Sequence, residues 1–142
     1  NTTILNNNAS YNKKRGICVN TDSNDNNITE NTVNNNNQHG IYLDYNCDFN
    51  NIINNTINDN TETGIHLYYS DSNVIKNNTI NRNDLGIGLY WSDNNNISGN
   101  TLIDNSWCIY ENEASTGNII EYNDCSPPTV YEPIFIDDSD TN

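Results

Sequence analysis

The chain has 142 residues and a formal net charge of −14, from 19 acidic and 5 basic residues. So few cations leave no basic face to follow a phosphate backbone, which argues against nucleic-acid binding, and no apolar run approaches the roughly 20 residues of a membrane span. Only 33% of the residues are hydrophobic and 35 are Asn, a composition that would suggest disorder if the apolar residues were not regularly spaced.

The apolar residues follow an internal repeat of 22 to 24 residues. One unit, Gly-Ile-x-aliphatic, begins at Gly16, Gly40, Gly64 and Gly86. A second unit, Ile-x-x-Asn-Thr-aliphatic, lies between these and occupies residues 28–33, 52–57, 75–80 and 97–102. A fixed period of this length is typical of a solenoid, in which each repeat buries its apolar face only by stacking on its neighbours.

Within each unit the apolar residues alternate with others, which indicates short, half-buried β-strands. Strands that stack in register once per repeat predict an all-β fold, a parallel β-helix of about five to six coils whose neighbouring strands lie about 4.8 Å apart. The predicted inward columns are Ile17, Ile41, Ile65, Ile87 and Ile109; Val19, Leu43, Leu67 and Leu89; Ile28, Ile52, Ile75, Ile97 and Ile120; Val33, Ile57, Ile80, Leu102 and Cys125; and a small-residue corner of Ser23, Cys47, Ser70, Ser92 and Ser115.

One further column contains only asparagine: Asn31, Asn55, Asn78, Asn100 and Asn123. Asparagine tolerates the left-handed backbone of tight turns, and its amide can bond to the Asn of the coil above and below. We therefore expect an asparagine ladder, which accounts structurally for much of the Asn content.

The two ends of the repeat differ from its middle. The pattern is already running at Ile4, and in the fifth coil Cys108 takes the glycine position while Glu111 takes an inward aliphatic position. Beyond Asn123 the pattern stops. We predict a parallel β-helix at 1–125 and a Pro-containing acidic tail at 126–142 that caps or links. Since solenoids normally carry polar caps, the uncapped start predicts either a longer β-helix or subunits that stack end to end.

The pattern Gly-Ile-x-Leu-x-x-Ser-x-x-Asn-x-Ile-x-x-Asn-Thr-Ile resembles the parallel β-helix repeat of carbohydrate-binding and sugar-hydrolase domains. It also resembles the Asn-rich β-helix proteins of archaeal cell envelopes, including surface-layer, sheath and adhesin-like proteins. The resemblance covers roughly residues 4–123 and implies a single-stranded, right-handed solenoid. It is specific for the fold and says little about activity, because one fold hosts many functions.

Aromatic residues recur at outward positions of the repeat. Tyr45, Tyr68 and Tyr90 are predicted to form one outer column and Tyr69 and Trp91 the next, with Tyr42 and His66 close by. A contiguous aromatic patch usually marks an interface, and flat rings also stack on sugars. Three interpretations stay open: an assembly interface, a glycan-binding platform, and rings that only stabilise the ladder.

Two acidic columns bear on catalysis and metal binding. Polysaccharide lyases and hydrolases of this fold need a basic residue beside Ca²⁺-binding carboxylates, or carboxylates facing each other across a cleft. The column of Asp59, Arg82 and Asp104 is better explained by charge compensation between coils, so we predict no catalytic residue and no enzyme activity. The column Asp48, Asp71 and Asp93 is a weak Ca²⁺ candidate, with solvated turn residues as the alternative. No other metal or cofactor is expected.

The four cysteines, which lack the spacing of a zinc site, are candidates for disulfide bonds: Cys18, Cys47, Cys108 and Cys125. A bond between Cys108 and Cys125 would staple the terminal coil, whereas Cys18 points outward and is a candidate for pairing with another chain. Candidate N-glycosylation sites are Asn8, Asn27, Asn54, Asn77 and Asn96, and their use would fit an extracellular protein.

These features favour an extracellular structural protein, a self-assembling subunit of a cell-surface layer, sheath or filament whose partner is a copy of itself. The alternative function is a carbohydrate-binding or adhesin module that binds cell-surface glycans through its aromatic ladder. A polysaccharide lyase or hydrolase is the third hypothesis, and the lack of a basic and carboxylate cluster argues against it.

Overall fold

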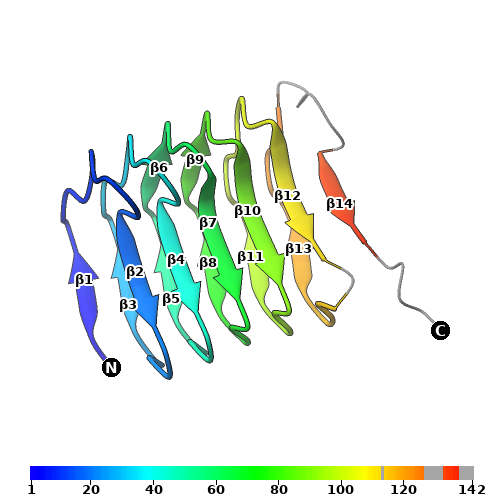
Figure 1. Cartoon of the computed structure of the whole chain (residues 1–142). Helices are drawn as coiled ribbons and strands as arrows, with labels where there is room; N and C mark the ends of the chain where they lie inside the picture. The colour runs from blue at the N-terminus through cyan, green and yellow to red at the C-terminus, as the bar shows by residue number, and fades with distance from the viewer. Residues whose placement is uncertain (113, 127–132, 138–142) are drawn as a thin grey trace.

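The computed structural model describes residues 1–112, 114–126 and 133–137. They form a right-handed parallel β-solenoid of about six turns, as the repeat predicted, with no helix among the described residues. The coils stack in chain order from the N-terminal to the C-terminal end of the molecule (Figure 1). Within the described part of the chain, therefore, no helix is long and apolar enough to cross a membrane.

Three parallel sheets run along the stack. The first sheet consists of β1 (Thr3–Leu5), β3 (Asn27–Thr29), β5 (Asn51–Ile53), β8 (Val74–Lys76), β11 (Asn96–Ser98) and β13 (Ile119–Glu121). The second sheet consists of β2 (Ile17–Asn20), β4 (Ile41–Asp44), β7 (Thr63–Tyr68), β10 (Leu85–Tyr90), β12 (Trp107–Glu111) and β14 (Ile134–Ile136). The third is β6 (Thr56–Asn58) with β9 (Thr79–Asn81).

The predicted inward columns form the core. Strand pairing places Ile41 beside Ile65 and Ile52 beside Ile75, and all four side chains are fully buried. The small-residue corner is confirmed as well, because the Ser70 hydroxyl oxygen accepts the backbone N–H of Cys47 at 3.3 Å. Apolar burial by stacking thus stabilises a chain whose overall composition is polar.

The asparagine ladder is confirmed. The Asn78 side-chain oxygen accepts both the backbone N–H and the side-chain N–H of Asn55, at 2.8 and 3.0 Å, and the Asn78 amide donates to the Ile52 carbonyl at 2.9 Å. Two similar ladders were not predicted: Asn26, Asn50, Asn73, Asn95 and Asn118, and Asn36, Asn60, Asn83 and Asn105. The side-chain oxygens of these ladders therefore accept backbone N–H groups that the turns between strands leave unpaired.

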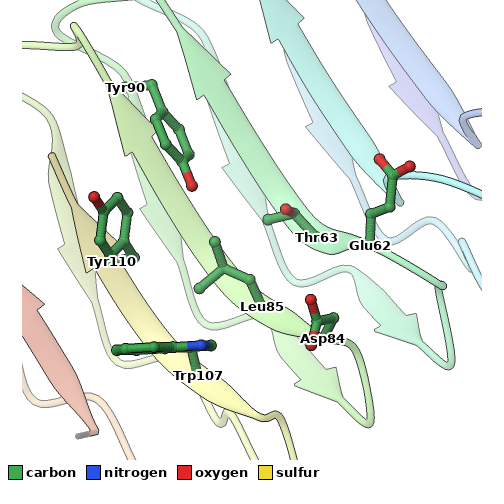
Figure 2. Close-up of a pocket in the computed structure, with 7 residues that line it drawn as sticks. All are labelled: Glu62, Thr63, Asp84, Leu85, Tyr90, Trp107 and Tyr110. Atoms are coloured by element: carbon green, nitrogen blue, oxygen red, sulfur yellow. The ribbon is translucent and has the colours of Figure 1, made fainter. Parts of the chain in front are cut away.

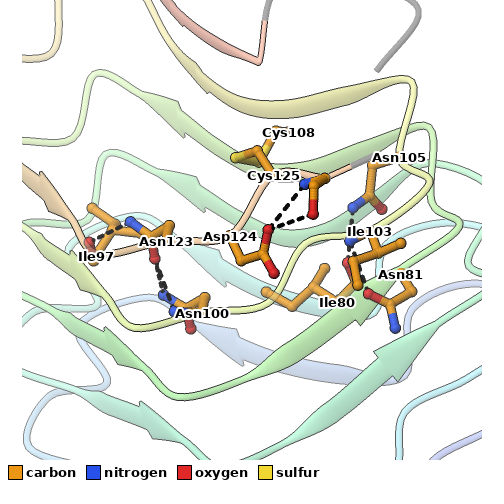
Figure 3. Close-up of a disulfide and its surroundings, with 11 residues drawn as sticks. Ile80, Asn81, Ile97, Asn100, Ile103, Asn105, Cys108, Asn123, Asp124 and Cys125 are labelled. Carbon is orange, nitrogen blue, oxygen red and sulfur yellow. Dashed lines mark hydrogen bonds between the residues drawn. A yellow bond between two sulfur atoms is a disulfide. The ribbon is translucent and has the colours of Figure 1, made fainter. Parts of the chain in front are cut away.

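The C-terminal coil is held by the predicted disulfide between Cys108 and Cys125, drawn in Figure 3 with the neighbouring asparagines. Strand β14 lies within the region predicted as a tail and pairs in parallel with β12, so that Phe135 lies beside Tyr110. The boundary between β-helix and tail at residues 125 and 126 stays a prediction, and residues 127–132 and 138–142 of that tail lie outside the described residues.

Candidate functional site

Aromatic rings follow one another across the outer face of the second sheet. Six of them form a series that we call the aromatic row: His39, Tyr42, His66, Tyr90, Tyr110 and Phe135. Neighbouring ring centroids lie 5.2, 5.1, 4.8, 5.3 and 5.7 Å apart in that order. The row extends from the turn before β4 to β14 and therefore crosses the strands instead of following one of them.

Gly88 is the position at which the row would otherwise be interrupted. It pairs with His66 on one side and Tyr110 on the other but has no side chain. The Tyr90 ring fills the gap, stacked on His66 with an interplanar angle of 12°. A Cβ atom on Gly88 would lie 3.0 Å from Cε2 of Tyr90 and 2.8 Å from Cδ2 of Leu85. The glycine therefore gives the Tyr90 ring the room to join the row.

A second series of rings, the turn row, lies where the chain leaves the second sheet and consists of Tyr45, Tyr69 and Trp91. These rings stack at 5.4 and 5.2 Å and are 38 to 49% exposed. Tyr68 packs edge-on against all three. Because the three rings stack on one another, much of their flat surface is used within the turn row.

The predicted assignment of Tyr45 to the column of Tyr68 and Tyr90 is wrong. Strand pairing places Asp44 beside Tyr68, so Tyr45 is equivalent to Tyr69, 24 residues later. Beyond this turn the shift falls to 23, since Cys47 pairs with Ser70. The coil that contains Tyr69 therefore has one residue fewer in this turn than the coil that contains Tyr45. A constant shift of 23 residues between the two coils wrongly places Tyr45 beside Tyr68.

Both histidines of the aromatic row are held neutral by burial. Burial, with a smaller effect of the Arg15 guanidinium, lowers the pKa of His39 to about 4 despite the nearby Glu62 carboxylate. Burial, then the neighbouring His39, lowers the pKa of His66 to about 3. Neither imidazole is therefore an acid near neutral pH, which supports the interpretation of His66 as an aromatic member of the surface.

His39 is also fixed in orientation. Its Nδ1 accepts the backbone N–H of Thr63 at 3.3 Å, so that Nε2 carries the proton and donates to the Glu62 carboxylate at 3.2 Å. At the N-terminal end of the row, the Arg15 guanidinium lies 3.9 Å from the centre of the Tyr42 ring. The N-terminal end of the row thus contacts both a cation, Arg15, and a fixed carboxylate, Glu62.

A pocket of about 310 Å³ lies beside the C-terminal half of the row. It is lined by Glu62, Thr63, Asp84, Leu85, Tyr90, Trp107 and Tyr110. Figure 2 shows Leu85 between the three rings on one side and the two carboxylates on the other. The plane of Trp107 makes angles of 79° with Tyr110 and 74° with Phe135, so this indole stands across the row instead of stacking within it. The pocket combines ring surfaces with charged hydrogen-bond acceptors.

Most residues of the pocket were not predicted from the sequence, although the repeat contains a pattern that includes several of them. The residue immediately before each repeat glycine, or before Cys108 in the glycine position, points outward and forms a column of its own: Arg15, His39, Thr63, Leu85 and Trp107. The position of Tyr110, beside Tyr42 and His66 in the repeat, was equally available. The predicted residues Tyr42, His66 and Tyr90 do lie in the aromatic row, whereas Tyr45, Tyr69 and Trp91 lie in the separate turn row.

The candidate Ca²⁺ column has a structural role. The Asp48 carboxylate accepts the backbone N–H of Asp71 at 2.7 Å, and the Asp71 carboxylate accepts that of Asp93 at 2.8 Å. Burial raises the pKa of Asp71, and the neighbouring carboxylates add to the effect. The column is thus an acidic counterpart of the asparagine ladders, and Ca²⁺ binding to it stays a prediction.

The predicted charge compensation at Arg82 is confirmed by a two-point contact with Asp59 at 2.7 and 2.8 Å.

The remaining predicted sites are scattered over the solenoid. Cys18 is exposed and Cys47 is buried, both as free thiols, and an intermolecular bond through Cys18 stays a prediction. The five candidate glycosylation sites also stay predictions. Of these, Asn8, Asn54 and Asn77 are exposed, while Asn27 and Asn96 are partly buried.

The described residues do not offer a fitting transition-metal site. Copper is bound in proteins by imidazole, thiolate and thioether ligands. No group of three His, Cys, Asp or Glu side chains converges in the described part of the chain, and the sequence has no Met. His39 uses both ring nitrogens, and two of the four thiols form the disulfide.

Comparison with known proteins places the chain in a family. The family model described as periplasmic copper-binding protein (NosD) matches residues 1–131. No curated protein sequence matches the chain. The copper named in the family description finds no ligand set among the described residues, so we assign no role in this chain to that metal.

Several solved structures share the fold. A mutant of the periplasmic alginate epimerase AlgG is 29% identical over 82% of this chain and 29% of its own, with a TM-score of 0.77. AlgG itself is 23% identical over 95% of this chain and 39% of its own, with a TM-score of 0.75. The A-module of the Azotobacter vinelandii mannuronan C-5 epimerase AlgE4 is 18% identical over 94% of this chain and 44% of its own, with a TM-score of 0.73. The chain thus spans less than half the length of these proteins.

These similarities correct two predictions and leave a third without support. A structural role in a surface layer or sheath is contradicted, because the similar structures are epimerases. The expectation of a protein without enzyme activity is contradicted on the same ground. The resemblance to archaeal cell-envelope proteins finds no support. A location outside the cytoplasm is supported, since the family and AlgG are described as periplasmic, but placement on the cell surface is not.

Proposed function

The chain belongs to the NosD family, and from its aromatic face and its likeness to carbohydrate-modifying β-helices we propose that it binds a polysaccharide as part of a carbohydrate-modifying protein. The pocket beside β10 holds one sugar unit, and the aromatic row lies under the units that follow. The proposal concerns this segment of the solenoid, which covers 29 to 44% of the similar structures named above.

The composition of the pocket lining, which joins aromatic rings with carboxylates, is the observation that carries the proposal. Trp107 lines the pocket together with Tyr90 and Tyr110, on the same cavity as Glu62 and Asp84. A flat indole beside hydrogen-bonding groups suits the apolar face of a sugar ring, whose hydroxyls need polar partners at its rim.

The polar groups of the pocket complete such a site. The carboxylates of Glu62 and Asp84 accept hydrogen bonds from sugar hydroxyls, and the Tyr90 hydroxyl can donate or accept. The same two carboxylates are the acidic side chains of the pocket lining, and they are the candidates for a general base toward the bound sugar. Modification of the bound sugar at this pocket is therefore part of the proposal.

Isothermal titration calorimetry against a panel of acidic, neutral and basic oligosaccharides tests the binding. Trp107→Ala should lower the affinity for the bound glycan at least tenfold, by loss of the ring surface. Trp91→Ala is the matched control, since it removes an indole from the turn row and should leave binding unchanged. Equal effects of the two substitutions would overturn the proposed site. Modification is tested by following the bound glycan by NMR during incubation with the protein.

A further inference from the structure

We infer that the pocket takes an amino sugar, a unit with a protonated amine, in place of the acidic sugars of the mannuronan named for AlgE4. The inference rests on the proposed glycan-binding function and specifies its ligand class. It comes from the charged side chains that line the pocket, Glu62 and Asp84, which are both acidic.

The two carboxylates of the pocket occupy equivalent positions in adjacent coils. The backbone N–H of Asp84 donates to the Glu62 carbonyl at 3.0 Å, so the two residues are neighbours across the stack. Both side chains border the same cavity from neighbouring coils. A bound ammonium group is attracted to both carboxylates, whereas a bound carboxylate is repelled by them.

No positive side chain offsets these charges within the pocket lining. His39 donates a hydrogen bond to Glu62 but stays neutral, so it orients the carboxylate without cancelling its charge. Arg15 lies on the Tyr42 ring and is not among the residues that line the pocket. The net charge of −14 extends the same preference over the whole molecule and attracts cationic ligands from solution.

The aromatic side of the pocket suits a cation as well. Trp107, Tyr90 and Tyr110 border the cavity across Leu85 from the carboxylates (Figure 2). Ammonium groups are attracted to aromatic faces, most strongly to indole, and the attraction grows where water is excluded. An amino sugar placed over Leu85 thus meets ring surfaces on one side and carboxylates on the other, and each side contacts a different part of the same unit.

Calorimetry with three matched oligosaccharides tests the inference: glucosamine, N-acetylglucosamine and mannuronate oligomers of equal length. Glucosamine oligomers should bind at least tenfold more tightly than the other two, with an affinity that falls as salt is raised. Asp84→Asn should remove most of that preference while leaving the thermal midpoint unchanged. The control Asp25→Asn removes one charge from an exposed turn outside the pocket and should have little effect.

The alternative outcomes separate the two proposals. Equal binding of the acetylated and free amine forms, or tighter binding of mannuronate, would overturn the amino-sugar inference and leave glycan binding in place. An equal loss on Asp25→Asn and Asp84→Asn would show general attraction to an acidic protein and overturn the site. No binding of any oligosaccharide would overturn the proposed function and the inference together.

Discussion

A disulfide bond joins Cys108 to Cys125 in the terminal coil. In the preceding coil, the equivalent positions are occupied by Gly86 and Leu102, which lie against each other. The strand register makes Gly86 equivalent to Cys108, and the bridge between Thr101 and Asp124 makes Leu102 equivalent to Cys125. In the inner coils this contact is so close that a Cβ atom on Gly86 would lie 2.7 Å from Cδ2 of Leu102. The terminal coil, which has fewer neighbours to bury it, replaces that contact with a covalent bond.

Removing this disulfide should therefore destabilise the C-terminal coil. Its cysteines are 17 residues apart, and closing a loop of that length stabilises by about 3 kcal/mol. Cys108→Ser with Cys125→Ser should lower the free energy of unfolding by about this amount in urea titrations. Cys47→Ser is the control, since serine already occupies the equivalent positions 70 and 92, and it should be nearly neutral. An equal stability of the double variant and the wild type would contradict a stapling role.

The asparagine ladders should be as important as the apolar core. Asn78→Ala leaves the backbone N–H of Asn55 and the Ile52 carbonyl buried without partners. Since each unsatisfied buried group costs about 1 to 3 kcal/mol, we expect a loss of several kcal/mol in the free energy of unfolding. The control is Asn37→Ala, at an exposed position. A loss no larger than that of the control would show that the ladder amides are replaceable by water.

The fold could be predicted because each position is sampled about five times along the chain. One unusual residue, such as Glu111 in an aliphatic column, does not hide a pattern that Leu43, Leu67 and Leu89 repeat. The position after Tyr69 at which the coil has one residue fewer could not be located from the sequence. The turns contain no recurring apolar residue that would mark the register there.

The pocket could not be predicted by the same procedure. Its column changes chemistry at every coil, from His39 through Thr63 and Leu85 to Trp107, so no repeat draws attention to it. The angle of the Trp107 ring depends on the packing of Tyr110 and Phe135, which sequence spacing does not specify. The predicted structural role was wrong for a related reason: a repeat specifies a solenoid, and the function depends on side chains outside the repeat.

Gly88→Ala should disturb the aromatic row and leave the solenoid folded. The new methyl group would lie 3.0 Å from the Tyr90 ring, which is exposed enough at the surface to swing away. We expect a changed near-UV circular dichroism spectrum, a loss of about tenfold in glycan affinity, and a destabilisation of about 1 to 3 kcal/mol from local overpacking. An unchanged near-UV spectrum would contradict the role of Gly88 in seating Tyr90.

Stability should fall as the pH is lowered below about 6.5, because the folded protein keeps His39 and His66 neutral. Their pKa values drop from 6.5 to about 4 and about 3, so between these values the unfolded chain binds more protons than the folded one. The contribution is complete above pH 6.5 and is lost progressively down to about pH 4 for His39 and pH 3 for His66. Each pKa unit corresponds to about 1.4 kcal/mol, so the two together amount to several kcal/mol.

Urea titrations between pH 4 and 8 measure this dependence, and His66→Phe isolates the larger part of it. Phenylalanine keeps a ring between Tyr42 and Tyr90 but cannot be protonated, so the variant should lose less stability on acidification than the wild type. His39→Gln should reduce the slope by a smaller amount, because its pKa is displaced less. The many carboxylates change the stability of the wild type and the variants alike, so the difference between the curves reports the histidines. Parallel curves would contradict the burial of a neutral imidazole at position 66.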